Sequence, residues 1–305
     1  MLLCYNEEKD VKGNKSMKNN FLKVTGFAAL AFTGYAYWST KQLRETEYTI
    51  ASAKIAPELD GFRVLQLSDV HGCTFGRYNH RLIKKIWQLD PDIIVVTGDL
   101  LDGDEGINTV ITLMRKLARR YPIYYVTGNH EAHSANLEDL LPALAKSGIV
   151  YLNNQHVYIE RDGKTFALAG IDDPSLQIQK PHDLTLEEEV AREEEIVVAE
   201  IKEATAGIPD PIFTFLLSHR PEKWAIYQQA AIDLVCCGHA HGGQIRLPGT
   251  QGLYAPQQGL LPKWTAGIHR ANGKAMIISR GVGNATIVPR VFNEPELPVI
   301  TLRHK

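Results

Sequence analysis

The chain has 305 residues, 44% of them hydrophobic and 22% charged, with a formal net charge of −2. This composition is typical of a globular protein with one large domain or two smaller ones, and the near-neutral charge argues against a broad nucleic-acid-binding surface. Four cysteines are too few for a disulfide framework. The adjacent Cys236 and Cys237 are expected as small buried side chains on opposite faces of a strand.

The N-terminal segment joins a lysine-containing stretch to an apolar run. Residues 1–20 are polar, and residues 24–38 contain no charged side chain. With aromatic side chains near its end, the segment 21–40 is predicted to be an uncleaved signal anchor or transmembrane helix. Lysines before the run predict a cytoplasmic N-terminus and an extracytoplasmic globular part in a single-pass membrane protein. A secreted protein and a cytoplasm-facing one are the alternatives, and Met17 is an alternative start to Met1.

Apolar runs and helical patterns alternate in the rest of the chain. Residues 41–60 are expected to form a linker or an edge strand, and residues 61–305 a single globular domain. Strands are predicted at residues 62–68, 93–97, 123–127, 150–152, 157–160, 166–171, 213–217, 232–237, 275–279 and 299–302. Helices are predicted at residues 78–89, 106–120, 137–146, 184–206 and 221–230. Residues 246–268 form a loop that is unusually apolar.

Five of the predicted strands end in side chains that can bind metal ions. They are Asp69 and His71, then Asp99, then Asn129 and His130, then His219, and finally His239 and His241. A single histidine at a strand end is more often structural than a ligand, but residues just beyond the carboxyl ends of strands converge at one edge of an α/β sheet. Carboxylates, imidazoles and an amide suit Mn, Fe or Zn. The set exceeds the needs of one ion and fits two ions that share a carboxylate, an arrangement used in phosphoester hydrolysis.

In chain order, these motifs resemble the five sequence blocks of the calcineurin-like metallophosphoesterases. The blocks are Asp69-Val70-His71, Gly98-Asp99-Leu100-Leu101-Asp102, Gly128-Asn129-His130-Glu131, His219 and Gly238-His239-Ala240-His241. The following Gly242-Gly243-Gln244, with the predicted anchor, resembles the bacterial membrane-associated phosphodiesterase branch. The similarity covers about residues 61–303. It implies an α/β fold, a four-layer αββα sandwich of two mixed β-sheets flanked by helices, which the order of predicted elements also fits.

The resemblance implies a role for each matching residue. Asp69, His71 and His241 would hold one ion, Asn129, His219 and His239 the other, and Asp99 would bridge the two. His130 would act on the scissile phosphate, and Asp102 would either orient His130 or cap the next helix. Glu131 and His133 are expected at the surface or behind the ligands. Candidate substrate-binding residues are Arg220 and Arg280, with Arg246 and Arg290 as further phosphate-binding candidates.

The resemblance implies an enzyme that hydrolyses phosphoric esters with a hydroxide bridging two divalent ions. A phosphodiesterase or pyrophosphohydrolase is the preferred prediction, and the anchor and the apolar loop favour lipid-linked or cell-envelope phosphates as substrates. The alternatives are a phosphomonoesterase, a UDP-2,3-diacylglucosamine pyrophosphohydrolase and a non-catalytic scaffold that keeps the fold. No nucleic-acid partner is indicated.

Overall fold

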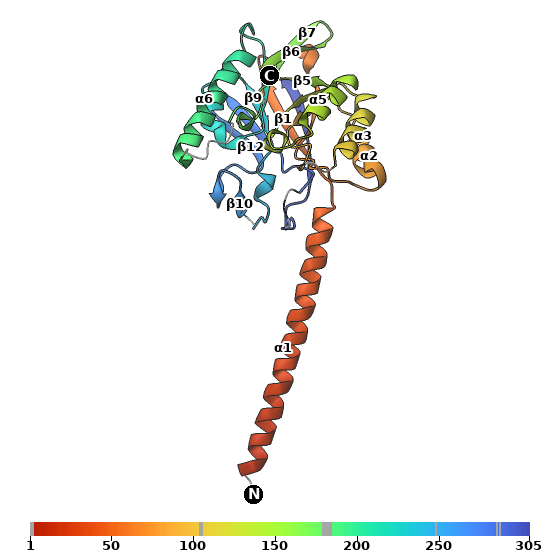
Figure 1. Cartoon of the computed structure of the whole chain (residues 1–305), viewed down its shortest axis with the longest axis vertical. Coiled ribbons are helices and arrows are strands. Elements are labelled where there is room, and N and C mark those ends of the chain that lie inside the picture. Colours follow the sequence, from red (N-terminus) through yellow and green to blue (C-terminus); the bar gives the residue numbers. More distant parts are fainter. Residues whose placement is uncertain (1–2, 104–105, 179–184, 248, 285, 287) are drawn as a thin grey trace.

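A computed structural model of the chain describes residues 3–103, 106–178, 185–247, 249–284, 286 and 288–305, and for residues 3–19, 22 and 186 only the backbone. Residue 184, the predicted start of a helix, lies outside this range. Figure 1 shows a globular body with a long helix extending from it. This helix is α1 (Leu3–Thr40).

Two six-stranded sheets form the centre of the described part of the chain (Figure 1). The first has the order β1 (Arg44–Ser52), β14 (Glu296–His304), β2 (Arg63–Leu67), β3 (Ile93–Thr97), β4 (Ile123–Val126) and β5 (Val150–Tyr151). The second has the order β12 (Gly267–Ala271), β13 (Lys274–Ile278), β9 (Leu234–Cys237), β8 (Thr214–Leu217), β7 (Lys164–Gly170) and β6 (Gln155–Arg161). A small hairpin pairs β10 (Tyr254–Ala255) with β11 (Gly259–Leu260).

Both sheets are mixed, with a parallel centre. Strands β2 to β5 run parallel, and β14 joins β2 in antiparallel register, with Ile300 opposite Val64. In the second sheet β13, β9, β8 and β7 are parallel, while β12 and β6 are antiparallel at its edges. The carboxyl ends of the parallel strands therefore lie at one edge of each sheet, where binding residues gather in α/β folds.

Helices cover the outer faces of the two sheets. The α-helices of the globular body are α2 (His80–Leu89), α3 (Ile107–Ala118), α4 (Asn129–Ala132), α5 (Leu137–Lys146), α6 (Leu186–Ala204) and α7 (Trp224–Tyr227). Short 3-10 helices lie at Pro57–Leu59, Arg77–Asn79, Pro174–Leu176, Pro221–Lys223 and His241–Gly243. Helices α2, α3 and α5 pack on the first sheet, and α6 and α7 pack on the second.

Alternating apolar side chains divide the core into three clusters. Val64 of β2 packs between the sheets, whereas its neighbour Leu65 packs under the helices. Likewise Cys236 lies between the sheets and Cys237 faces α6 and α7. This alternation is expected for strands buried on both faces. The predicted αββα sandwich is therefore confirmed, as are the opposite faces of the two cysteines.

Two expectations about elements need adjustment, and a third, the edge strand, is confirmed. The last strand extends over Glu296–His304 and lies inside the first sheet, between β1 and β2. The edge strand expected within residues 41–60 is β1, which pairs in parallel with β14. The helix predicted at residues 221–230 is shorter, because a 3-10 turn precedes α7 and the chain leaves the helix after Tyr227.

Helix α1 covers the predicted membrane segment. In the described part of the chain, no helix is both long enough and apolar enough to cross a bilayer. The transmembrane prediction for residues 21–40 is therefore not supported. Apolar side chains are nevertheless exposed to solvent on this helix: Phe27 is 76% exposed and Leu30 is 75% exposed.

Candidate metal centre

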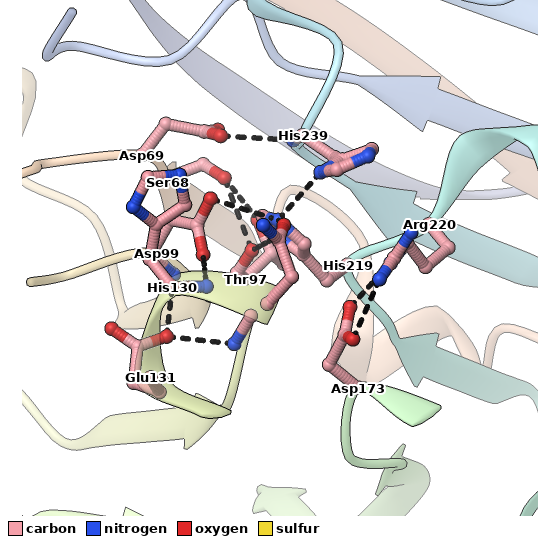
Figure 2. A network of polar contacts seen from close by, with 12 residues as sticks. Ser68, Asp69, Thr97, Asp99, His130, Glu131, Asp173, His219, Arg220 and His239 are labelled. Atoms are coloured by element: carbon pink, nitrogen blue, oxygen red, sulfur yellow. Dashed lines mark hydrogen bonds and ion pairs between the residues drawn. The ribbon is translucent and has the colours of Figure 1, made fainter. Parts of the chain in front are cut away.

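The metal-ligating residues predicted from the sequence converge between the carboxyl edges of the two sheets (Figure 2). The two edges are joined directly, because Gln66 Nε2 of β2 donates to the carbonyl of Cys237 in β9 at 2.8 Å. The backbone N–H of His239 also donates to Asp69 Oδ1 at 2.9 Å. The site is therefore built from both sheets and depends on how they pack.

One group of donors consists of Asp69, His71, Asp99 and His241, all buried, with ligand atoms within 4.8 Å of one another. The Nε2 atoms of His71 and His241 lie 3.2 Å apart. His241 Nε2 is 3.5 Å from Asp69 Oδ1, and His71 Nε2 is 3.7 Å from Asp99 Oδ2. Four donors from three loops thus face one small volume.

A second group contains Asp99, His219 and His239. His219 Nε2 lies 3.1 Å from Asp99 Oδ2 and 3.2 Å from both His239 Nδ1 and Asn129 Oδ1. Asp99 therefore belongs to both groups, as a ligand shared by two ions must. All seven predicted ligands are brought together by the fold.

The donor set fits divalent ions. Asp69 Oδ2 is buried and has no hydrogen-bond partner among the described residues, and a buried carboxylate oxygen is costly unless something compensates it. The facing imidazole nitrogens at 3.2 Å can share only one hydrogen per pair, whereas a metal ion accepts a lone pair from each of them. A cation between these atoms would satisfy them all. Carboxylate, imidazole and amide donors select Mn, Fe or Zn over softer ions.

Burial controls the protonation of the histidines. It lowers the pKa of His71 to about 4 and holds the pKa values of His239 and His241 well below their ordinary value, so these rings are neutral, as metal ligands must be. For His219, burial would also lower the pKa, but the carboxylate of Asp99 outweighs it and raises the pKa to about 10. In the ion-free site a proton on His219 therefore lies where an ion would bind, and binding must release it.

The backbone is left-handed at five of the seven predicted ligands. The φ angles are 52° at Asp69, 47° at His71, 53° at Asp99, 67° at His239 and 46° at His241. Residues other than glycine rarely adopt this region, and each such residue costs about 1–3 kcal/mol. The packing of the two sheets holds these conformations, which turn the side chains back toward the space between the strand ends.

Glycines permit the loops to approach closely. A Cβ at Gly238 would lie 2.5 Å from Asp69 Oδ2 and closer still to Ser68 Oγ. A Cβ at Gly128 would lie 2.6 Å from the backbone nitrogen of Asp99. Only glycine fits at these two positions while the ligand carboxylates keep their places.

Glu131 is the site residue whose position the sequence left open. Its carboxylate is completely buried and accepts hydrogen bonds from three backbone N–H groups: Asp99 at 2.8 Å, Leu101 at 3.0 Å and Gly128 at 2.7 Å. It therefore lies behind the ligands and joins the loop after β3 to the loop after β4. His133, by contrast, is exposed.

The predicted catalytic pair is in contact at the rim of the site. His130 Nδ1 lies 3.3 Å from Asp102 Oδ1, and the His130 ring packs edge-on against His71, with ring centres 4.6 Å apart. The backbone N–H of His130 donates to Asp99 Oδ1 at 2.9 Å. His130 is half-buried, so its ring borders both the donor groups and solvent.

The arginine candidates for substrate binding are paired with carboxylates. Arg220 is 1% exposed and donates to Asp173 through Nε at 2.5 Å and Nη2 at 2.9 Å (Figure 2). Arg280 Nε lies 3.2 Å from Glu296 Oε2. A contact of either side chain with substrate stays a prediction. Arg290 is nearest the donors, with Nη2 3.3 Å from His241 Nδ1, and burial lowers its pKa to about 10.

Comparison with known proteins agrees with this geometry. The sequence profile described as calcineurin-like phosphoesterase matches residues 62–243. The chain is 27% identical to the metallophosphoesterase YkuE of Bacillus subtilis, over 97% of this chain and 99% of that protein. It is 26% identical to the phosphodiesterase YaeI of Escherichia coli, over 79% and 82% of the two chains. It is also 29% identical to a Danio rerio protein named transmembrane protein with metallophosphoesterase domain, over 94% of this chain and 63% of that protein.

Proposed function

Because the chain belongs to the calcineurin-like phosphoesterase family and is thus a phosphoric ester hydrolase, we propose that it cleaves phosphodiester or pyrophosphate bonds. The observation that carries this proposal is the position of Asp99, whose carboxylate belongs to both donor groups. A relative named as a phosphodiesterase also favours a diester over a monoester. The catalytic domain would comprise residues 61–305, with β1 completing its first sheet.

Two divalent ions, Mn, Fe or Zn, would supply the Lewis acidity that neutralises phosphate charge and makes water a nucleophile at neutral pH. Asp69, His71 and His241 would hold one ion, Asn129, His219 and His239 the other, and Asp99 both. Asn129 contributes a neutral oxygen, which limits the negative charge that would repel an anionic substrate.

His130 would serve as the acid at the rim of the centre. Its Nδ1 contact with Asp102 would fix the ring and leave Nε2 free to protonate the leaving oxygen of the ester. The ring packs against His71, which keeps it beside the first donor group. Asp102 would therefore act through His130 rather than on the substrate.

An apolar surface beside the centre supports lipid-linked or cell-envelope phosphates as substrates. It consists of Leu247, Tyr254, Leu260, Leu261 and Phe292, which are between 49% and 80% exposed. Their segments are neighbours, since Leu253 bonds to Ile245 and Ile245 bridges Val291. The rings of Tyr35 in α1 and Phe292 lie 5.2 Å apart, so this apolar surface continues into the exposed helix. We infer that α1 and this surface associate with a membrane.

The test is a hydrolysis screen of the full-length protein loaded with Mn, Fe or Zn. Aryl phosphomonoesters, aryl phosphodiesters, nucleotide pyrophosphates and a polyprenyl-linked pyrophosphate are compared. The proposal expects turnover of diesters or pyrophosphates at least tenfold faster than of monoesters. A clear preference for monoesters would replace it with a phosphomonoesterase. Two bound ions per chain without turnover of any substrate would favour the scaffold.

A further inference from the structure

The hairpin that follows the metal-binding loop reaches back to one of the ligands. Gln257 lies at the tip between β10 and β11, and its Oε1 atom is 2.6 Å from His239 Nε2. We propose that Gln257 is a positioning residue that fixes the ring and tautomer of His239, so that Nδ1 is presented to the second ion. The inference rests on the proposed dinuclear centre.

The hydrogen bond determines which nitrogen of His239 is free. An amide oxygen only accepts hydrogen bonds. His239 Nε2 must therefore carry the hydrogen and donate it in the bond to Gln257 Oε1. In a neutral ring Nδ1 is then unprotonated, and Nδ1 is the atom that faces His219 Nε2 at 3.2 Å. A ligating histidine commonly donates its other ring N–H to an oxygen acceptor, which fixes its orientation and raises its basicity. Gln257 supplies that acceptor from 18 positions further along the chain.

The hairpin is built to hold this glutamine in place. Gln257 has a left-handed backbone, with φ at 54°, which turns its amide inward although the residue is at the surface. Its neighbour Gln258 closes the hairpin, donating to the carbonyl of Trp264 at 2.7 Å and accepting from the N–H of Trp264 at 2.9 Å. The N–H of Leu253 lies 3.0 Å from the carbonyl of Gly243, two residues after the ligand His241. The hairpin is therefore held to the metal-binding loop through Leu253 and to the following segment through Gln258.

This arrangement makes the second ion depend on the hairpin. Loss of the acceptor frees the His239 ring to rotate or to change tautomer, while the first donor group should be little affected, since in the described part of the chain the hydrogen bond of Gln257 goes to His239, which is outside that group. Removal of such a partner of a metal-ligating histidine typically lowers metal affinity by about 10- to 100-fold. The effect should be confined to one of the two ions.

The test is a titration of the ion-free, full-length protein with Co²⁺, followed by visible absorption and calorimetry. Gln257→Met keeps the length of the side chain without the acceptor, and Gln257→Glu restores an oxygen. The first equivalent of Co²⁺ should bind all variants alike. The second should bind Gln257→Met at least tenfold more weakly, and Gln257→Glu as tightly as the parent or more tightly. Lys263→Gln, at an exposed position just after the hairpin, should bind both ions like the parent.

Two results would overturn the inference. One is equal binding of the second ion by the parent and Gln257→Met. The other is equal weakening in Gln257→Met and Gln257→Glu, because the hairpin rather than the hydrogen bond would then be responsible. The titration needs no substrate, so a wrong substrate class leaves its outcome unchanged. Failure of the parent to bind a second Co²⁺ ion would instead count against the dinuclear centre itself.

Discussion

The carboxylate of Glu131 accepts a hydrogen bond from the backbone N–H of Asp99, with Oε2 and N separated by 2.8 Å. The same carboxylate accepts from Leu101 and Gly128, so it satisfies three buried donors in two loops. This contact helps to hold Asp99 in both donor groups, because its left-handed backbone lies outside any regular strand or helix.

Glu131→Ala should therefore damage stability and metal binding together. Three buried N–H groups would lose their acceptor, which predicts a loss of about 3 kcal/mol or more in the free energy of unfolding. Urea unfolding and metal content by mass spectrometry measure the two effects. Glu160→Ala, at an exposed position of β6, is the control and should change neither. Unchanged stability of Glu131→Ala would contradict the role assigned to the carboxylate.

Gly238→Ala should distort the first donor group. The added Cβ would lie 2.5 Å from Asp69 Oδ2, and Asp69 cannot retreat because its other oxygen accepts the N–H of His239. We expect a loss of about 1–3 kcal/mol in stability and at least one ion fewer per chain. Gly34→Ala, where a Cβ meets nothing within 4 Å, is the matched control. Normal metal content in Gly238→Ala would show that the loops tolerate the methyl group.

Asp102 and His130 should behave as one unit in catalysis. His130→Asn is expected to lower kcat by about 100-fold, and Asp102→Asn by about 10-fold, with two ions still bound in each. Because Asp102 would act through His130, the double variant should be no slower than His130→Asn alone. Steady-state kinetics on an aryl phosphodiester test this. If the two losses multiply, the two side chains act independently and the pairing is not catalytic.

The sequence was sufficient to predict which donor side chains converge, because each follows an apolar strand; their role as metal ligands stays a prediction. A buried strand such as β9 is recognised by its continuous apolar run, and its carboxyl end fixes where His239 and His241 must lie. Apolar runs likewise predicted the strands of the two sheets. The alternation of side chains along a strand predicted that Cys236 and Cys237 face opposite sides. These features follow from short segments of the chain, so one amino-acid sequence is enough to predict them.

Other features depend on contacts between distant residues. Gln257 stands in an apolar loop with no motif to mark it, and Glu131 resembles a surface residue until its three backbone donors are seen. The contact of Arg220 with substrate stays a prediction, but its pairing with Asp173, 47 positions earlier, could not be seen from the sequence. The left-handed ligand backbones also carry no compositional signal, because Asp and His replace the glycine usual in that region.

Buried Glu200 should make stability depend on pH. It lies in α6, where burial, with help from Asp172, raises its pKa from 4.5 to about 8. The folded protein then binds a proton that the unfolded chain releases above pH 4.5, so this contribution to stability is complete below pH 4.5 and is lost as pH rises through 8. Glu200→Gln should remove this slope. We expect its stability relative to the parent to rise by about 4 kcal/mol between pH 5 and 8.5, measured by urea unfolding. A constant difference between the two proteins would refute the shifted pKa.

The apolar surface beside the metal centre should matter only for lipid-linked substrates. Leu260 and Leu261 are 80% and 70% exposed, and burying both against acyl chains is worth about 2 kcal/mol, or about 30-fold in kcat/KM. The double variant Leu260→Gln, Leu261→Asn should lose this factor on a polyprenyl-linked pyrophosphate in phosphatidylglycerol vesicles. Its activity on a water-soluble aryl diester should stay within twofold of the parent, because both side chains are exposed and neither residue belongs to a donor group. Tyr158→Gln is the control, since it is 45% exposed on β6, at the opposite end of the globular body from β10 (Figure 1). Equal losses on both substrates would mean that the leucines support the centre itself, and no loss on either would remove the lipid from the proposed function.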